Sequence, residues 1–292
     1  MMARKVACCC ALGLAFIACS TPASEADDAT RGPALPGGPA ACSGIETEPS
    51  AAPQSFSRLS ARVVDENAEP ARVLTHQVCG FDLCLFGEID DSANVDVAAA
   101  TVTPITAPAF KYGMGLEYAQ FVYRLPDEPA ITLGSVATVR FPEVGSGEPL
   151  LAGKPARSGE VSVELTAGTR IKLDMLTFSA PEELLFRAAR VPLELELPAL
   201  DRSLGLELLI ATTPVNTTFC PPAKLSIANT LGWPPGSRVE LFVHGVELAQ
   251  RWAPYGGWSQ VSEGAVSSDG ARIETDPEGG IPTLSVFGIR RK

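Results

Sequence analysis

Two histidines are the only side chains in this 292-residue chain that could serve as the base of a catalytic triad. His76 lies within a predicted strand, and His244 lies at the end of another, before Gly245. No Gly-x-Ser-x-Gly nucleophile motif accompanies either histidine. We therefore expect His76 to be a surface or half-buried residue and His244 to be a hydrogen-bonded residue at a sheet edge.

Carboxylate pairs are the second candidates for catalysis. Glu182 is next to Glu183, and Asp90 is next to Asp91. Adjacent residues of a strand point to opposite faces, whereas glycoside hydrolysis needs two carboxyl groups that face each other across a cleft. The sequence therefore predicts no catalytic residues, and we expect that the protein is not an enzyme and needs no cofactor.

Four cysteines follow Cys19 in the chain: Cys42, Cys79, Cys84 and Cys220. Four cysteines can form two disulfides in three different ways. Cys79 and Cys84 flank a predicted hairpin turn, where their side chains can approach bonding distance. We expect a disulfide between them, which leaves Cys42 to pair with Cys220.

A metal site is the alternative reading of the same cysteines. Cys79 and Cys84 lie near Asp82, Asp90 and Asp91, and His76 is the one histidine close to them in sequence. Zinc sites normally space their cysteines by two to four residues and add a second pair or histidines. The spacing therefore favours disulfides, and we expect no metal.

An aromatic cluster is the candidate binding surface. Trp252, Tyr255 and Trp258 lie within a Gly- and Pro-rich stretch, and two of the three tryptophans of the chain fall there. Aromatic side chains on such loops present flat apolar faces to sugars or partner proteins. The alternative is that Trp252 and Trp258 pack inward and cap the core, which is the commoner fate of large aromatic side chains.

The N-terminus has the parts of an export signal: Arg4 and Lys5, an apolar stretch over Val6–Ala18, and small residues after it. Thirteen apolar residues are fewer than the roughly 20 that span a bilayer as a helix. Phe16-Ile17-Ala18-Cys19 resembles a bacterial lipobox, which implies that the Cys19 thiol carries acyl chains such as palmitate and that residues 1–18 are removed. The alternative is cleavage after a small residue such as Ala23, which would release a secreted or periplasmic protein.

Residues 19–55 are rich in Pro, Ala, Gly, Ser and Thr and contain almost no large apolar side chains. Such a segment buries too little surface to fold, so we expect a disordered tether. Removing the leader deletes two basic residues and leaves 21 basic against 34 acidic residues, a net charge of about −13. This balance argues against nucleic acid or anionic lipid as a partner, since binding phosphates requires clustered Lys and Arg.

Short runs of β-branched and aromatic residues, separated by Gly, Pro, Asn and Asp, predict an all-β protein over the remaining residues. The clearest predicted strands are 60–65, 121–125, 131–141, 161–165, 206–211, 239–245 and 283–289. One helix is expected, over Pro181–Ala189, because Pro181 begins it, two glutamates follow, and apolar residues recur at helical spacing.

The first predicted module, residues 56–155, begins with a valine-rich strand and the turn Asp65-Glu66-Asn67-Ala68-Glu69-Pro70, and a second turn runs over Asp90–Asn94. These features resemble the carboxypeptidase regulatory-like, transthyretin-type β-sandwich, in which Gly stands at the positions of Ala68 and Ala93. The resemblance implies an accessory or adhesive module without peptidase activity.

The second predicted module, residues 156–292, opens with Val161–Gly168 and continues through Thr213–Ile227. The latter stretch is similar to the Gly-Pro-x-Gly-x-x-Phe-x-x-Pro-x-x-Leu-x-Ile pattern of ZU5-like β-sandwich domains, with Thr213 and Asn216 at the places of the glycines. The resemblance predicts no chemistry.

Together these features predict an envelope lipoprotein with two β-sandwich modules on a tether. By analogy with lipoproteins, Ser20 after the lipidated cysteine favours the outer membrane. We expect a role in adhesion, protein interaction or envelope structure, with a surface protein or polysaccharide as partner. The alternatives are a carbohydrate-binding or hydrolase-accessory protein that uses the Trp252–Trp258 loop, and a carrier of a small hydrophobic ligand.

Overall fold

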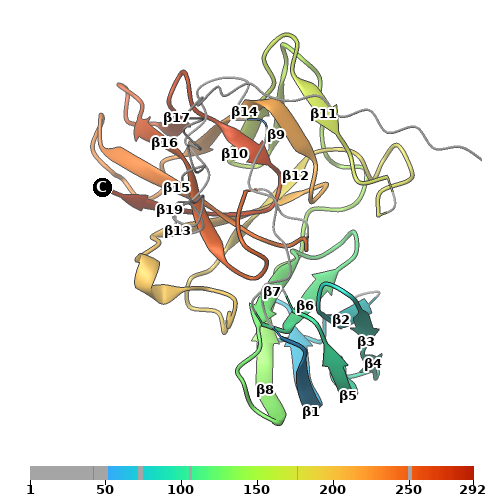
Figure 1. The fold of residues 1–292 in the computed structure, drawn as a ribbon. Coiled ribbons are helices and arrows are strands. Elements are labelled where there is room, and N and C mark those ends of the chain that lie inside the picture. Colours follow the sequence, from blue (N-terminus) through green and yellow to red (C-terminus); the bar gives the residue numbers. More distant parts are fainter. Residues whose placement is uncertain (1–41, 43–51, 72–74, 105–106, 176, 249–251) are drawn as a thin grey trace, which may run out of the picture. The chain divides into compact units, whose positions relative to one another are not determined.

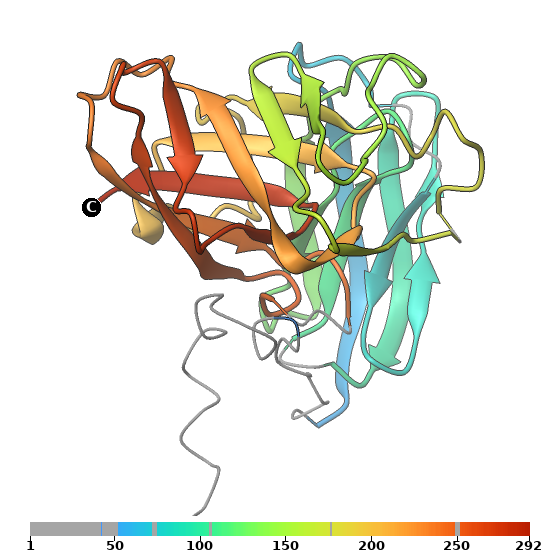
Figure 2. The same ribbon diagram turned by 90° about the horizontal axis from the view of Figure 1, so that it is seen from above.

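The protein is all-β in its computed structural model, with 51% of residues in strands and 2% helical. The structure describes Cys42 and residues 52–71, 75–104, 107–175, 177–248 and 252–292. Each strand that the sequence predicted overlaps an observed strand, because alternating apolar residues are the signature of a half-buried strand. Figure 1 labels every strand except β18, and Figure 2 shows the same ribbon turned by 90°.

The first eight strands form two four-stranded sheets that enclose a core. One sheet has the order β4-β5-β1-β8 and the other the order β3-β2-β6-β7. Leu59 on β1 and Phe110 on β6 are completely buried in the same core cluster, so the two sheets pack face to face as a sandwich. The bounds are β1 Gln54–Val64, β2 Thr75–Cys79, β3 Cys84–Phe86, β4 Glu88–Ile89, β5 Asn94–Val102, β6 Ala109–Met114, β7 Phe121–Arg124 and β8 Ala130–Ala137.

The later strands form one eleven-stranded sheet that curls until its ends meet. The path is β12-β13-β19-β15-β16-β17-β14-β10-β9, and β11 and β18 pair with β14 off this path. At the closure, the Ala188 N–H on β12 donates to Ser158 Oγ on β9 over 2.9 Å. The bounds are β9 Pro155–Ser158, β10 Val161–Glu164, β11 Arg170–Lys172, β12 Arg187–Val191, β13 Leu208–Thr213, β14 Thr218–Ala228, β15 Arg238–His244, β16 Trp258–Val266, β17 Arg272–Thr275, β18 Ile281–Thr283 and β19 Val286–Arg291.

The helix expected over Pro181–Ala189 is not formed. The Glu183 carboxylate turns back and accepts the backbone N–H groups of Ser179 and Ala180 at 2.7 and 2.9 Å, which closes a turn. The following residues enter β12, which pairs with β13. A helix of nine residues is marginal by itself, so the ladder with β13 prevails over local helical preference.

Two turns of the first module have the same hydrogen-bond pattern. In each, an aspartate (Asp65 or Asp90) accepts from the backbone N–H groups two and four residues later, at 2.9–3.1 Å. The fourth residue of each turn is an alanine with positive φ: 64° at Ala68 and 58° at Ala93. An L-residue in this left-handed region costs about 1–2 kcal/mol.

Replacing these alanines by glycine is therefore expected to stabilise the protein. Ala68→Gly should raise the free energy of unfolding by about 1 kcal/mol, because glycine adopts positive φ at little cost. Ala93→Gly should raise it by less, because the Ala93 methyl group is buried and its loss offsets part of the gain. The measurement is urea unfolding followed by circular dichroism. The matched control is Ala98→Gly on β5, which should lower the free energy of unfolding. Destabilisation by the two turn substitutions would contradict the argument.

Candidate functional site

His76 is completely buried, which corrects the expectation that it lies at or near the surface. It lies on β2 with its ring 6.0 Å from that of Phe110, inside the first sandwich. Among the described residues, neither of its ring nitrogens has a hydrogen-bond partner. Burial lowers its pKa to about 4, so the ring is neutral at physiological pH and has no route to a substrate.

His244 is also completely buried, but both of its ring nitrogens are hydrogen-bonded. Nε2 accepts the backbone N–H of Val122 over 3.1 Å, and Nδ1 lies 3.0 Å from the Gly257 carbonyl oxygen. This pair of partners assigns the proton to Nδ1, so the ring donates to Gly257. The strand that carries His244 lies inside the large sheet between β19 and β16, which corrects its expected place at a sheet edge.

The contact between His244 and Val122 joins the two modules, and other bonds flank it. Lys111 on β6 donates to Glu247 over 2.6 Å, and Gln120 donates to the Val246 carbonyl over 3.2 Å. The first core also includes Leu209, Ala211 and Val286 from the second module. The two modules therefore share apolar packing as well as polar contacts, and His244 has a structural role at their junction.

The aromatic cluster packs inward. Trp252 and Tyr255 are 7% and 4% exposed, and the Trp258 indole N–H donates to the Ala199 carbonyl over 2.8 Å. The burial of Trp252 and Tyr255 agrees with inward packing, the commoner of the two fates considered for this cluster, and Trp258 is partly buried. No flat face of Trp252 or Tyr255 is open to a sugar ring.

Both expected disulfides are present. Cys79 pairs with Cys84, across the β2–β3 hairpin, and Cys42 pairs with Cys220 at the start of the longest strand of the large sheet. The four thiols are therefore not metal ligands. In the part of the chain that the structure describes, no group of three His, Cys, Asp or Glu side chains is placed to hold a metal ion. Cys19 lies outside the described residues.

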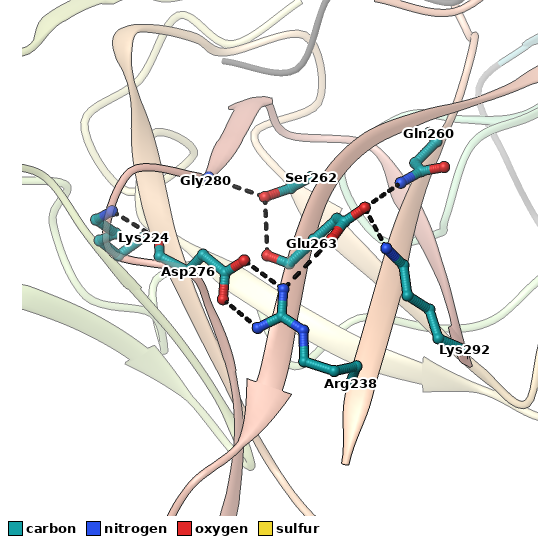
Figure 3. Close-up of polar contacts among 8 residues, drawn as sticks. All are labelled: Lys224, Arg238, Gln260, Ser262, Glu263, Asp276, Gly280 and Lys292. Atoms are coloured by element: carbon teal, nitrogen blue, oxygen red, sulfur yellow. Dashed lines mark hydrogen bonds and ion pairs between the residues drawn. The ribbon is translucent and has the colours of Figure 1, made fainter. Parts of the chain in front are cut away.

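A charged network on the second module is a polar cluster that the sequence did not predict (Figure 3). Arg238 forms a bidentate ion pair with the Asp276 carboxylate, with N–O distances of 2.8 and 2.6 Å. The Glu263 carboxylate accepts hydrogen bonds from Arg238, Gln260 and Lys292. These hydrogen bonds lower the pKa of both carboxyl groups. No short motif could reveal the network, because sheet pairing brings its members together from β15, β16, the loop after β17 and the chain end.

The Lys224 ammonium belongs to the same region and lies within a ring of backbone carbonyls. It donates to the carbonyl oxygens of Asp276, Pro277 and Gly279. Figure 3 shows it beside the loop that follows Asp276. Because each charge already has a partner within the protein, this network stabilises the loop and the chain end rather than offering a free ligand site.

A polar hollow lies on the outer face of the sheet β4-β5-β1-β8. Its volume is about 620 Å³. Arg58 pairs through two nitrogens with the Asp96 carboxylate across β1 and β5, and this pairing lowers the Asp96 pKa. The other residues that line the hollow are small, polar or aliphatic, and none of them is aromatic. They are Ser60, Ala61, Arg62, Glu88, Ile89, Asp90, Asn94, Val95, Thr132, Gly134 and Ser135. Such a surface can donate and accept hydrogen bonds but cannot stack against a ring.

An exposed apolar cluster lies at the edge of the first module. Phe81, Leu83 and Phe86 are 49%, 45% and 66% exposed. They belong to residues Phe81–Asp91, here called the edge segment, which contains β3 and β4. These are terminal strands of the two sheets, and Gly87 alone separates them. The Cys79–Cys84 disulfide closes the loop that carries Phe81 and Leu83, so their positions are constrained.

The polar hollow and the edge segment are continuous. Glu88, Ile89 and Asp90 belong to the edge segment and also line the hollow. The sequence contained one signal for this surface, the paired cysteines around Phe81 and Leu83, but it gave no reason to place those side chains outside the core. The edge segment and the hollow together are the candidate functional surface.

Among the described residues, no helix has the length and apolar character needed to cross a bilayer. A comparison of the chain with models of known protein families and with curated proteins finds no match.

Proposed function

We propose that this protein is a lipoprotein of the bacterial cell envelope that is anchored through Cys19 and acts by binding a partner protein, without catalysis. The observation that carries the interaction role is the exposure of Phe81, Leu83 and Phe86 on a disulfide-closed edge. Clustered exposed apolar side chains on an otherwise packed domain mark interaction sites.

The chemistry of the described residues supports a role without catalysis. Both histidines are buried, and burial lowers their pKa values. Neither can take a proton from a nucleophile in contact with solvent. The two disulfides support an oxidising compartment such as the envelope.

Backbone geometry supports the proposed family resemblances. Ala68 and Ala93 take the positive φ angles that explain glycine at those places in carboxypeptidase regulatory-like domains. Asn216, at the place of a glycine in the ZU5-like pattern, also has positive φ, 64°. Asn is the residue that best tolerates this region after glycine. We therefore propose a carboxypeptidase regulatory-like module followed by a ZU5-like module, both acting as accessory domains.

The anchoring is tested by substituting the lipidated cysteine. Cys19→Ser is expected to abolish incorporation of labelled palmitate and to move the protein from the membrane fraction to the soluble fraction. The reason is that the acyl chains attached at Cys19 would supply the membrane affinity, which rises with each buried methylene group. Cys9→Ser, within the predicted leader, is the matched control and should leave labelling unchanged. A Cys19→Ser protein that still sediments with membranes would overturn the proposed anchor.

A further inference from the structure

We infer that the edge segment is a docking site for an extended segment of a partner protein in which basic and apolar residues alternate, added as a strand beside β3. The inference rests on the proposed interaction function, since it specifies what that surface binds. Strand addition at an exposed sheet edge is a general mode of peptide recognition, in which the backbone supplies affinity and alternate side chains supply specificity.

The first argument is the direction of the backbone groups of β3. The Leu83 carbonyl accepts from Gly80, and the Gly87 N–H donates to His76, so these groups point to the β2 side. Leu85 is paired with Val78 between them. Hydrogen-bonding direction alternates along an antiparallel strand, so the peptide groups of Cys84 and Phe86 point away from β2. Among the described residues, no strand pairs on that side.

The second argument is that β3 lacks most of the usual protection of an edge strand. Natural edge strands are kept short, carry charged residues or proline, or are covered by a loop, and each of these discourages pairing. β3 is short, with three residues, but it contains no charged residue and no proline. Here the strand ends in Phe86, which is 66% exposed, and the adjoining loop exposes Phe81 and Leu83. Leu85 points the other way and packs against the core, so β3 itself is firmly placed. The Cys79–Cys84 disulfide further reduces the conformational freedom lost on binding.

The third argument is charge, and it selects the occupant. The edge segment contains Asp82, Glu88, Asp90 and Asp91 and no basic residue. Arg62 in the adjoining hollow lies near Asp90 and offsets part of this charge, so the segment keeps a net negative charge. Hydrogen bonds from the Thr103 backbone to Asp82, and from Asn94 to Asp90, lower the pKa values of those carboxyl groups and keep them ionised. A basic segment is therefore attracted to this surface, which steers association.

The same charges disfavour the other possible occupants. In a symmetric pair of two copies, the edge segments would face each other, and like charges placed opposite across paired strands are destabilising. An anionic lipid surface would repel the segment in the same way. The occupant must cover the exposed apolar side chains and must carry charge opposite to that of the carboxylates. A strand of alternating basic and apolar residues can do both, since its apolar residues can cover Phe81, Leu83 and Phe86 while its basic residues face the carboxylates.

The test measures binding of synthetic peptides to the purified mature chain by isothermal titration calorimetry. The probe is acetylated Lys-Val-Lys-Val-Lys-Val-Lys, and it is compared with Glu-Val-Glu-Val-Glu-Val-Glu and with a form of the probe whose central amides are N-methylated. We expect binding of the basic peptide, at least about tenfold weaker binding of the acidic peptide, and loss of binding on N-methylation, because methylation removes the ladder donors. A bound probe should also perturb the amide resonances of Cys84 and Phe86.

Variants locate the site. Phe86→Ser should weaken binding of the basic peptide by at least about tenfold, as truncation of a central aromatic contact does at other interfaces. Since Phe86 is largely exposed, the fold should be retained. Met175→Ser, which alters an exposed apolar residue elsewhere, is the matched control and should bind normally. Glu88→Lys should weaken binding of the basic peptide and strengthen binding of the acidic one.

Several results would overturn the inference. These are no binding of the basic peptide, equal binding of the two charged peptides, equal effects of Phe86→Ser and Met175→Ser, or a dimer in sedimentation that Phe86→Ser abolishes. The last result would assign the edge to a second copy. Because peptide binding does not require the acyl chains, failure of the Cys19 anchor and failure of this docking site are separate outcomes.

Discussion

Loss of the disulfide between Cys42 and Cys220 is expected to lower the free energy of unfolding by up to about 5 kcal/mol. The bond joins residues 178 positions apart, so it removes a large amount of conformational freedom from the unfolded chain. It also fixes Cys42, in the segment predicted to be a tether, to β14 of the second module. The variant is Cys42→Ser with Cys220→Ser, measured by urea unfolding followed by tryptophan fluorescence.

The second disulfide provides the internal control. Cys79 and Cys84 are five positions apart, and the same loop-entropy relation predicts a loss of about 2 kcal/mol for Cys79→Ser with Cys84→Ser. The two double variants remove the same atoms, so their difference reports the length of the closed loop. A smaller loss for the Cys42–Cys220 pair than for the Cys79–Cys84 pair would refute this account.

Acidification from pH 6.5 to pH 4 is expected to destabilise the protein through His76 and His244. Burial lowers the pKa of each from 6.5 to about 4, so in this range the unfolded chain binds protons that the folded chain does not. Stability is therefore greatest above pH 6.5 and falls as the pH is lowered to about 4. The slope is up to about 1.4 kcal/mol per pH unit for each histidine, or about 3 kcal/mol each over the whole range.

Partly exposed carboxylates such as Asp96 and Asp276 act in a lower pH range. Hydrogen bonds and ion pairs lower their pKa values, so the stability that they contribute is present above the ordinary pKa range of a carboxyl group and is lost as the pH falls through that range and below it. Urea unfolding at pH 7, 6 and 5 therefore reports mainly the histidine contribution. A free energy of unfolding that stays constant over these values would show that the histidines are not buried and neutral.

Substitution should separate the two histidines. His76→Phe removes two buried nitrogens that lack partners among the described residues, so it should preserve or raise stability at pH 7 and reduce the slope by about half. His244→Phe leaves the buried Val122 N–H without its partner, which costs about 1–3 kcal/mol. The Gly257 carbonyl loses the hydrogen bond from His244 but still accepts from the Gly245 N–H over 2.9 Å. Equal effects of the two substitutions at pH 7 would contradict their different hydrogen bonding.

Local patterns in the sequence were sufficient to predict many of the strands and one of the two disulfides. Alternation of apolar residues predicted strands at 121–125 and 239–245, and β7 and β15 confirm them. The short spacing of Cys79 and Cys84 predicted both the hairpin and its disulfide. These features depend on neighbours in the chain, so the sequence contains the information directly. The expected helix over Pro181–Ala189 was wrong because its competitor, β13, lies some twenty residues away.

The sequence by itself was sufficient to predict the all-β class, the disulfide pairs and the tight turns, and to identify the histidines as the side chains that titrate near neutral pH. Only the tertiary structure decided which side chains are accessible. It buried His76, His244 and Trp252 and left Phe81 and Phe86 at an edge. The physical reason is that exposure depends on which sheet covers a strand face, and that depends on pairing between strands far apart in the chain. Alternation identifies an apolar face but does not identify the surface that packs against it.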